Sequence, residues 1–248
     1  MREVDVAIVG AGVAGCCVAR ECARFALKVA VFEAGLDVAD GNVVQEEQRL
    51  GALGGANSGI VHAGYDPKPG TRKARYNVEG AKLYPQWASE LGFPYINNGS
   101  MVLAFTEEEL EAIRGLHERG EHNGVGGLRV IDARELRELE PNVSPEALGA
   151  LLVPTGAICD PYQVAFRAGE NAARNGVEFN FSSKVVGIEP AQTPTADSAQ
   201  AVVAGSARSA VVEPARGAGY ILHIEGAQGD VAEAVHARVV VNAAGVHA

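Results

Sequence analysis

The sequence predicts an α/β fold in which a parallel sheet is continued by a β-meander and interrupted by an inserted α+β domain. A nearly all-apolar run, Val4–Val9, leads into the glycine-rich turn Gly10–Gly15, a helix-forming segment and a second apolar run, Val29–Phe32. Such a β-α-β unit places its strands in parallel with a right-handed crossover. Strand patterns over 178–188, 219–225 and 235–242 follow one another without an intervening helix, which predicts the meander.

Between these parts the sequence predicts helices separated by short strands. A helical pattern runs from about 71 to 91, where Pro85 is expected to kink or interrupt it. A strand is predicted over 99–105. Three later helices are indicated by a capping residue followed three positions on by Glu or Gln; the pairs are Thr106 with Glu109, Asp132 with Glu135, and Asp160 with Gln163.

Two polar stretches and the end of the sequence complete the prediction. Residues 40–53 predict a loop, and the Ala-, Ser-, Thr- and Pro-rich stretch 190–218 predicts a flexible insertion. The last strand runs into the small residues Ala243–Gly245, a turn that normally precedes a further helix. We therefore expect that the sequence lacks a C-terminal part.

Composition excludes several classes of protein. The 248 residues include 21 Lys and Arg against 31 Asp and Glu, a net charge of −10, which disfavours binding to nucleic acid. No apolar run reaches the roughly 18 residues of a membrane span. We see no signal peptide and expect a cytoplasmic protein, with peripheral contact at the inner membrane through a partner as a further option. The four cysteines lack metal-binding spacing, so no metal site is expected.

The glycine turn predicts a dinucleotide site. Gly10 permits a tight turn, Gly12 lets a pyrophosphate approach the backbone, and Gly15 lets the following helix pack closely. The N-terminus of that helix then offers free N–H groups to the phosphates. Glu33 ends the second strand, where a carboxylate can accept hydrogen bonds from ribose hydroxyls. An acidic residue there argues against NADP but does not separate NAD from FAD.

The order of motifs resembles the N-terminal part of FAD-dependent oxidoreductases of the D-amino acid oxidase type, with a glutathione-reductase-like, three-layer FAD domain. Besides Gly10–Gly15 and Glu33, the resemblance rests on the runs Ala56–Asp66, Lys68–Thr71 and Asn242–Gly245. The run Ala56–Asp66 is most similar to flavin-dependent, anaerobic-type glycerol-3-phosphate dehydrogenases. L-2-hydroxyglutarate oxidases have a similar stretch.

The resemblance implies FAD as cofactor and a set of site residues. His62 would be catalytic, either through its position near the flavin or by accepting the hydroxyl proton while hydride leaves for flavin N5. Tyr65 is a weaker candidate for the same pocket. Ser100 would face the substrate. Lys73 is a candidate on other grounds, because it belongs to the basic cluster that starts at Lys68, which could meet a substrate phosphate or carboxylate. The cofactor would contact Gly10, Gly12, Gly15, Glu33, Asn57, Ser58, His62, Gly64, Val185, Ala244 and Gly245.

The expected activity is oxidation of a secondary alcohol, first of all sn-glycerol 3-phosphate to dihydroxyacetone phosphate, with electrons passed to a quinone or a partner protein. L-2-hydroxyglutarate is the rival substrate, and the sequence is also compatible with an NAD-binding domain or an inactive fragment. The implied domains are a first FAD-binding segment (1–83), a partial substrate domain (84–160) and a second FAD-binding segment (161–248).

Overall fold

The computed structural model describes residues 1–40, 57–191, 211–212, 219–226 and 231–245, which form two compact units. The first unit comprises 1–58 and 161–248, and the second comprises 59–160. Residues 59–83 thus group with the inserted unit, because β3 (Ile60–Val61) pairs with β8 (Ala157–Cys159). The sequence places these residues in the first segment instead. The cofactor and substrate roles of the segments stay predictions. The predicted loop after residue 40 and most of the predicted insertion lie outside the described residues.

The first unit is built on one sheet with the strand order β10-β12-β13-β1-β2-β9, and β11 also pairs with β13. Strands β13, β1, β2 and β9 are parallel, whereas β12 and β10 continue the sheet as an antiparallel meander. The bounds are β1 (Arg2–Val9), β2 (Val29–Phe32), β9 (Glu178–Asn180), β10 (Lys184–Pro190), β11 (Val211–Val212), β12 (Tyr220–Glu225) and β13 (Val231–Asn242).

The register makes three parallel strands end level. Val9 pairs with both Phe32 and Asn242, so the carboxyl ends of β1, β2 and β13 share one edge of the sheet. In open α/β sheets, ligands bind outside such an edge. The register therefore places the segments that follow Val9, Phe32 and Asn242 next to one another.

The prediction of a single strand over 178–188 is wrong, because two strands occupy these residues. β9 joins the parallel part and β10 joins the meander. Between them Ser182 has a left-handed φ of 51°, and the Ser182 and Ser183 N–H groups donate to the carbonyls of Gly35 and Glu33. These bonds turn the chain out of the parallel sheet and into the meander.

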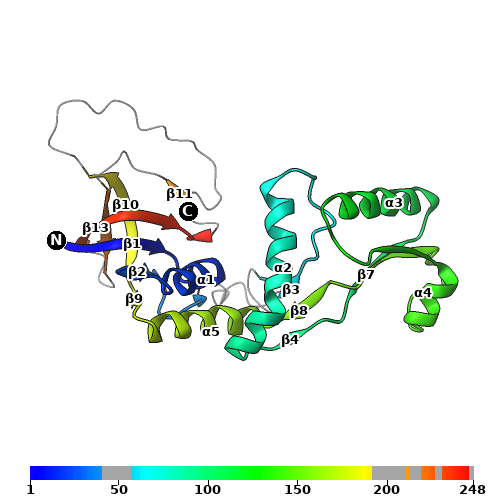
Figure 1. The fold of residues 1–248 in the computed structure, drawn as a ribbon, viewed down its shortest axis with the longest axis horizontal. Coiled ribbons are helices and arrows are strands. Elements are labelled where there is room, and N and C mark those ends of the chain that lie inside the picture. Colours follow the sequence, from blue (N-terminus) through cyan, green and yellow to red (C-terminus); the bar gives the residue numbers. More distant parts are fainter. Residues whose placement is uncertain (41–56, 192–210, 213–218, 227–230, 246–248) are drawn as a thin grey trace, which may run out of the picture. The chain divides into compact units, whose positions relative to one another are not determined.

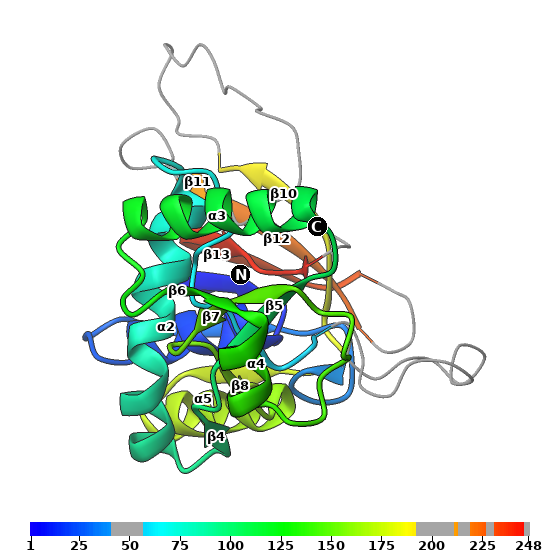
Figure 2. The ribbon, with the colours of Figure 1, turned by 90° about the vertical axis from the view of Figure 1, so that its right-hand side faces the viewer.

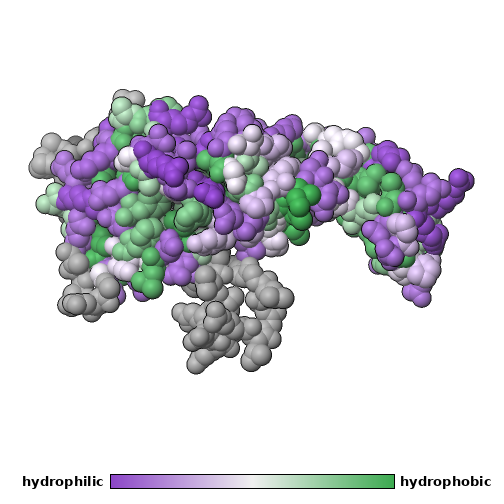
Figure 3. All heavy atoms as spheres, turned by 90° about the horizontal axis from the view of Figure 1, so that it is seen from below, coloured by the Kyte–Doolittle hydropathy of each residue, from purple (hydrophilic) through white to green (hydrophobic). Residues whose placement is uncertain are grey.

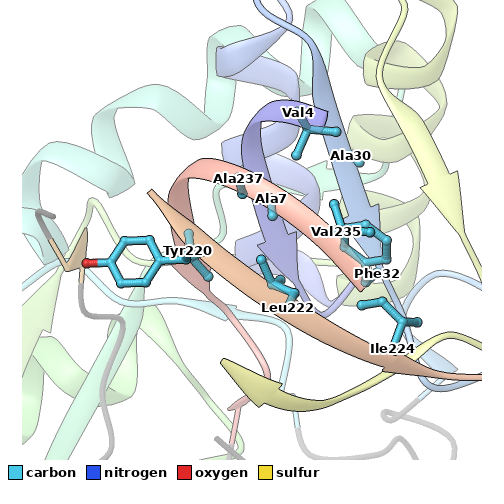
Figure 4. Packing of buried hydrophobic residues seen from close by; sticks show 10 residues of the cluster. Val4, Ala7, Ala30, Phe32, Tyr220, Leu222, Ile224, Val235 and Ala237 are labelled. Atoms are coloured by element: carbon cyan, nitrogen blue, oxygen red, sulfur yellow. The ribbon is translucent and has the colours of Figure 1, made fainter. Parts of the chain in front are cut away.

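Helices pack on one face of the parallel strands, and apolar side chains of the meander pack on the other face. α1 (Val13–Cys22) packs on α5 (Pro161–Arg174) (Figure 1). A Cβ on Gly169 of α5 would lie 3.3 Å from Cys16 Sγ. On the other face, Leu222 and Ile224 of the meander pack with Phe32 of β2 (Figure 4). The predicted three-layer arrangement is therefore confirmed.

The inserted unit contains two small antiparallel sheets, ordered β3-β8-β4 and β5-β7-β6. α3 packs on one side of the second sheet and α4 on the other (Figure 2). The remaining bounds are α2 (Arg72–Leu91), β4 (Tyr95–Ile96), β5 (Ser100–Ala104), α3 (Glu107–His122), β6 (Arg129–Asp132), α4 (Ala133–Leu139) and β7 (Gly149–Val153).

Helix ends follow the sequence signals only in part. Thr106 and Asp132 cap α3 and α4, accepting from the N–H groups of Glu109 and Glu135. The return bonds differ from a capping box, because Glu109 accepts from Phe105 N and Glu135 pairs with Arg129. The expected interruption of α2 is wrong, since it runs as one helix through its internal proline.

Exposed apolar side chains are interspersed with hydrophilic ones on the face shown in Figure 3. One group lies in register across the first small sheet, where Ile158 pairs with both Ile60 and Ile96, and all three are exposed. Within the described residues, no helix is both long and apolar enough to cross a membrane.

Replacing Leu151 with Ala is expected to lower the free energy of unfolding of the inserted unit by about 2–5 kcal/mol, because the buried side chain leaves a cavity. Leu151 is 0% exposed and packs with Ile113 and Val153. Urea unfolding followed by the fluorescence of Trp87, the single tryptophan, measures this. Leu139→Ala is the control, since Leu139 is 49% exposed. Equal losses in both variants would contradict the assignment of the core.

Candidate functional site

The turn after β1 is packed so closely that two of its glycines cannot be replaced without strain. Gly10 has a φ of 97°, and a Cβ there would lie 2.7 Å from the carbonyl oxygen of Ala243. A Cβ on Gly15 would collide with the carbonyl oxygen of Gly10. Among the described residues, by contrast, a Cβ on Gly12 would meet no atom within 4 Å. The backbone at Gly12 is therefore open to a close approach from outside.

The same turn leads into the N-terminus of helix α1. Gly12 is the N-cap of α1, has an extended backbone and makes no side-chain capping bond. A helix N-terminus carries a partial positive charge, which favours a phosphate group. Open backbone and helix N-terminus thus coincide at Gly12.

The turn after β13 lies directly against the glycine turn. The Ala243 N–H donates to the carbonyl of Val9 (2.8 Å), and the Ala244 N–H donates to Asn242 Oδ1 (3.1 Å). Gly245 has a φ of 68°. Ala244 and Gly245 are therefore brought to the same sheet edge as Gly10, and their contact with a cofactor stays a prediction.

Glu33 organises the loop that follows β2. Its half-buried carboxylate accepts from the Ala11 N–H (2.6 Å) with Oε2 and from the Gly35 N–H (2.8 Å) with Oε1. Each oxygen can still accept a second hydrogen bond. The carboxylate is thus fixed beside the glycine turn and can accept hydrogen bonds from hydroxyl groups of a ligand.

Val185 is the second residue of β10, a strand whose preceding turn is tied to Glu33. The Ser183 N–H donates to the Glu33 carbonyl (2.8 Å), and the Glu33 N–H donates to the Asn180 carbonyl (2.9 Å). Val185, two residues beyond Ser183, packs against the cluster that contains Phe32. The sequence singled out Val185 but gave no sign of the Ser183 contact, which depends on a turn that no local motif marks.

Burial keeps the thiols near this turn protonated. Cys16 is buried behind it and donates to the carbonyl of Ala11 (3.2 Å). Desolvation, the main cause, raises the pKa of Cys16 to about 12 and that of Cys17 to about 11. These groups are therefore poor nucleophiles near neutral pH.

The remaining candidates lie at the end of the first unit and in the inserted unit. Asn57 is half-buried and Ser58 exposed, and Gly59 separates them from β3. Their place along a cofactor stays a prediction. His62 is exposed and follows β3 at once. Gly64 is buried with a φ of 101°, and a Cβ there would lie 2.6 Å from Val78 Cγ2 of α2. Gly64 is thus needed where its loop packs on α2.

The predicted substrate contacts are separated within the inserted unit. A surface cavity of about 560 Å³ is lined by Arg72, Arg75 and Lys82, but not by Lys73, which is exposed on the same helix. Ser100 is exposed at the start of β5, and a Cβ on Gly156 would lie 2.7 Å from its Oγ. The structure does not bring Lys73 and Ser100 together, and their substrate roles stay predictions. Nothing in the described part of the chain gathers three potential metal ligands.

Comparison with known proteins shows what the chain is similar to. Residues 5–248 match the family described as FAD dependent oxidoreductase (DAO). A glycerol 3-phosphate dehydrogenase from Caloramator mitchellensis is 42% identical over 185 residues, 75% of this chain and 36% of the relative. A mitochondrial L-2-hydroxyglutarate dehydrogenase from Nematostella vectensis is 34% identical over 176 residues, 71% and 36% of the two chains.

A solved structure is similar over nearly the whole chain. The dithionite-reduced L-alpha-glycerophosphate oxidase from Mycoplasma pneumoniae with FAD bound has a TM-score of 0.76 and 26% identity, covering 97% of this chain and 53% of the oxidase. This chain therefore spans about a third to a half of the length of these relatives.

Substituting Glu33 with Gln is expected to destabilise the first unit by about 1–3 kcal/mol, because the new amide group would face one of the two backbone N–H donors. Thermal unfolding followed by circular dichroism measures the loss. Glu3→Gln, at an exposed position of β1, is the matched control and should change little. Equal melting temperatures for the Glu33→Gln variant and the unsubstituted protein would contradict the role given to the carboxylate.

Alkylation by iodoacetamide at pH 8 is expected to modify Cys159 well before Cys16, because Cys16 is buried and its pKa is raised to about 12. Peptide mass mapping over time measures both rates. In urea all four cysteines should react alike, which serves as the control. If Cys16 were modified as fast as Cys159 in the folded protein, the burial of Cys16 behind the glycine turn would be contradicted.

Proposed function

The chain belongs to the family of FAD-dependent oxidoreductases, and from this premise we propose that it forms the dinucleotide-binding part and a portion of the substrate domain of an enzyme that oxidises a secondary alcohol. Membership assigns FAD rather than NAD as the cofactor. The observation that carries the proposed substrate, sn-glycerol 3-phosphate, is the 42% identity with a glycerol 3-phosphate dehydrogenase. An inactive fragment is one outcome of the experiments below.

The residues at the sheet edge fit the cofactor. A dinucleotide needs a phosphate site without side chains and an acceptor for its ribose hydroxyls. Open space at Gly12, the uncapped start of α1 and the fixed carboxylate of Glu33 supply these features. In the proposal, Gly10 and Gly15 allow the close packing that shapes this edge, and Val185, Ala244 and Gly245 complete it.

The reaction needs a hydride acceptor and a group that takes the hydroxyl proton. Bound FAD would supply the acceptor. In the proposal His62 accepts the proton on its imidazole, and Asn57, Ser58 and Gly64 contact the cofactor near it. Lys73 and Ser100 would bind the anionic end of the substrate. The roles within the run Ala56–Asp66 come from its resemblance to the family. The role of Ser100 comes from the wider resemblance of the chain, and that of Lys73 from its place in a basic cluster.

A second substrate is favoured by a separate observation. The relative that is 34% identical to this chain is an L-2-hydroxyglutarate dehydrogenase. Both substrates contain a secondary hydroxyl and an anionic group, which is a phosphate in the first and a carboxylate in the second. Relatives named dehydrogenase and oxidase both occur, so the electron acceptor in the proposal is a quinone, a partner protein or oxygen.

Anaerobic addition of sn-glycerol 3-phosphate to the FAD-loaded protein is expected to bleach the visible flavin absorption, because the hydride reduces the flavin. Glycerol, which lacks the phosphate, should bleach it far more slowly. Bleaching by L-2-hydroxyglutarate, but not by its D-enantiomer, would replace the proposed substrate with the second one. A loaded protein that neither substrate reduces, although dithionite does, would contradict alcohol oxidation by this chain.

A further inference from the structure

The loop 62–67 is held by hydrogen bonds from a helix that follows it by some 40 residues in sequence. Three of its backbone carbonyls accept from side chains at the end of α3. Asn123 Nδ2 lies 2.9 Å from the Gly64 oxygen and 2.8 Å from the Pro67 oxygen, and an Nη1 atom of Arg119 lies 2.9 Å from the Asp66 oxygen. We call Asn123 and Arg119 the α3 clamp.

Asn123 suits this task by its place and its chemistry. It is the C-cap of α3, and its own N–H donates to the Arg119 carbonyl (3.0 Å), which fixes its backbone to the helix. A side-chain amide carries two N–H donors. Each can serve one loop carbonyl, so Asn123 bridges Gly64 and Pro67 with both of its donors.

Close packing supports the hydrogen bonds. Gly120 of α3 is buried, and a Cβ there would collide with Leu128 Cδ1 and lie 2.9 Å from Tyr65 Cβ. On the other side, Gly64 approaches α2 without a side chain of its own. The loop is therefore held between two helices as well as by the clamp.

His62 is fixed on both sides by these contacts. One residue before it, Val61 pairs with Ala157 of β8, and two residues after it the Gly64 carbonyl is bound by Asn123. The His62 side chain itself is exposed. Its backbone is thus set by the small sheet and the α3 clamp, while its imidazole is free to meet a ligand.

We propose that Asn123 and Arg119 are positioning residues that hold the loop 62–67, and with it His62, in the geometry that the reaction needs. The proposal rests on the proposed function in one respect, the role of His62. It assigns to α3 the task of positioning His62, although neither clamp residue has a predicted role in binding.

The test uses Asn123→Asp, which keeps the size of the side chain but removes both N–H donors and places a carboxylate against two carbonyls. Asn142→Asp is the matched control, because it introduces the same charge at an exposed position of the same unit. The Arg119→Lys variant keeps a donor and should therefore still hold the loop in part, whereas the Arg119→Met variant should not. Urea unfolding of every variant, followed by Trp87 fluorescence, establishes that the unit is folded.

Hydrogen exchange of the amides of residues 62–68 is the first readout. In the Asn123→Asp variant we expect roughly tenfold faster exchange there, as for the loss of one or two hydrogen bonds, with strands β5–β7 unchanged. Unchanged exchange in the loop would overturn the clamp. Equally faster exchange throughout the unit would overturn it too, because Asn123 would then serve general stability.

The rate of flavin bleaching by sn-glycerol 3-phosphate is the second readout, and it separates the two proposals. A slower rate in the Asn123→Asp variant, with the bound FAD spectrum retained, supports positioning. An unchanged rate despite a freed loop would overturn the positioning role. If the unsubstituted protein itself shows no bleaching, the proposed function fails, while loop exchange still decides whether the clamp exists.

Discussion

The close approach of two turns at the carboxyl edge of the parallel sheet is the constraint on which the rest of the first unit depends. The turn after β1 and the turn after β13 meet with Gly10 against the Ala243 carbonyl, where no side chain fits. Because Val9 pairs with both Phe32 and Asn242, the loop carrying Glu33 reaches the same edge. Because three strands end level, residues that are far apart in sequence are gathered at one edge, where we propose that FAD binds.

The inserted unit has its own internal order. Its loop 62–67 contains His62 and is held at three carbonyls by the α3 clamp, so the loop depends on a helix whose surface looks like an ordinary charged face in the sequence. The cationic side chains of α2 divide between a surface cavity, lined by Arg72 and Arg75, and the exposed Lys73 outside it.

Much of the fold could be predicted from local patterns, and the features that could not be predicted have identifiable physical causes. β2 has the predicted bounds and the glycine turn its predicted place, because apolar runs and glycine spacing are local signals. The strand predicted over 178–188 is split by the left-handed Ser182, whose turn is fixed by bonds to residues 33 and 35. The contacts of Asn123 were equally invisible, since an asparagine at a helix end does not reveal which distant carbonyls it binds.

Whether the sheet edge binds FAD can be decided from the visible absorption spectrum of the purified chain after incubation with FAD and removal of free cofactor, with chromatography of what heat releases. We expect a yellow protein that releases FAD in a near-equimolar amount. A colourless protein that is folded by circular dichroism would contradict the proposal that the glycine turn, Glu33 and the turn after β13 together bind this cofactor.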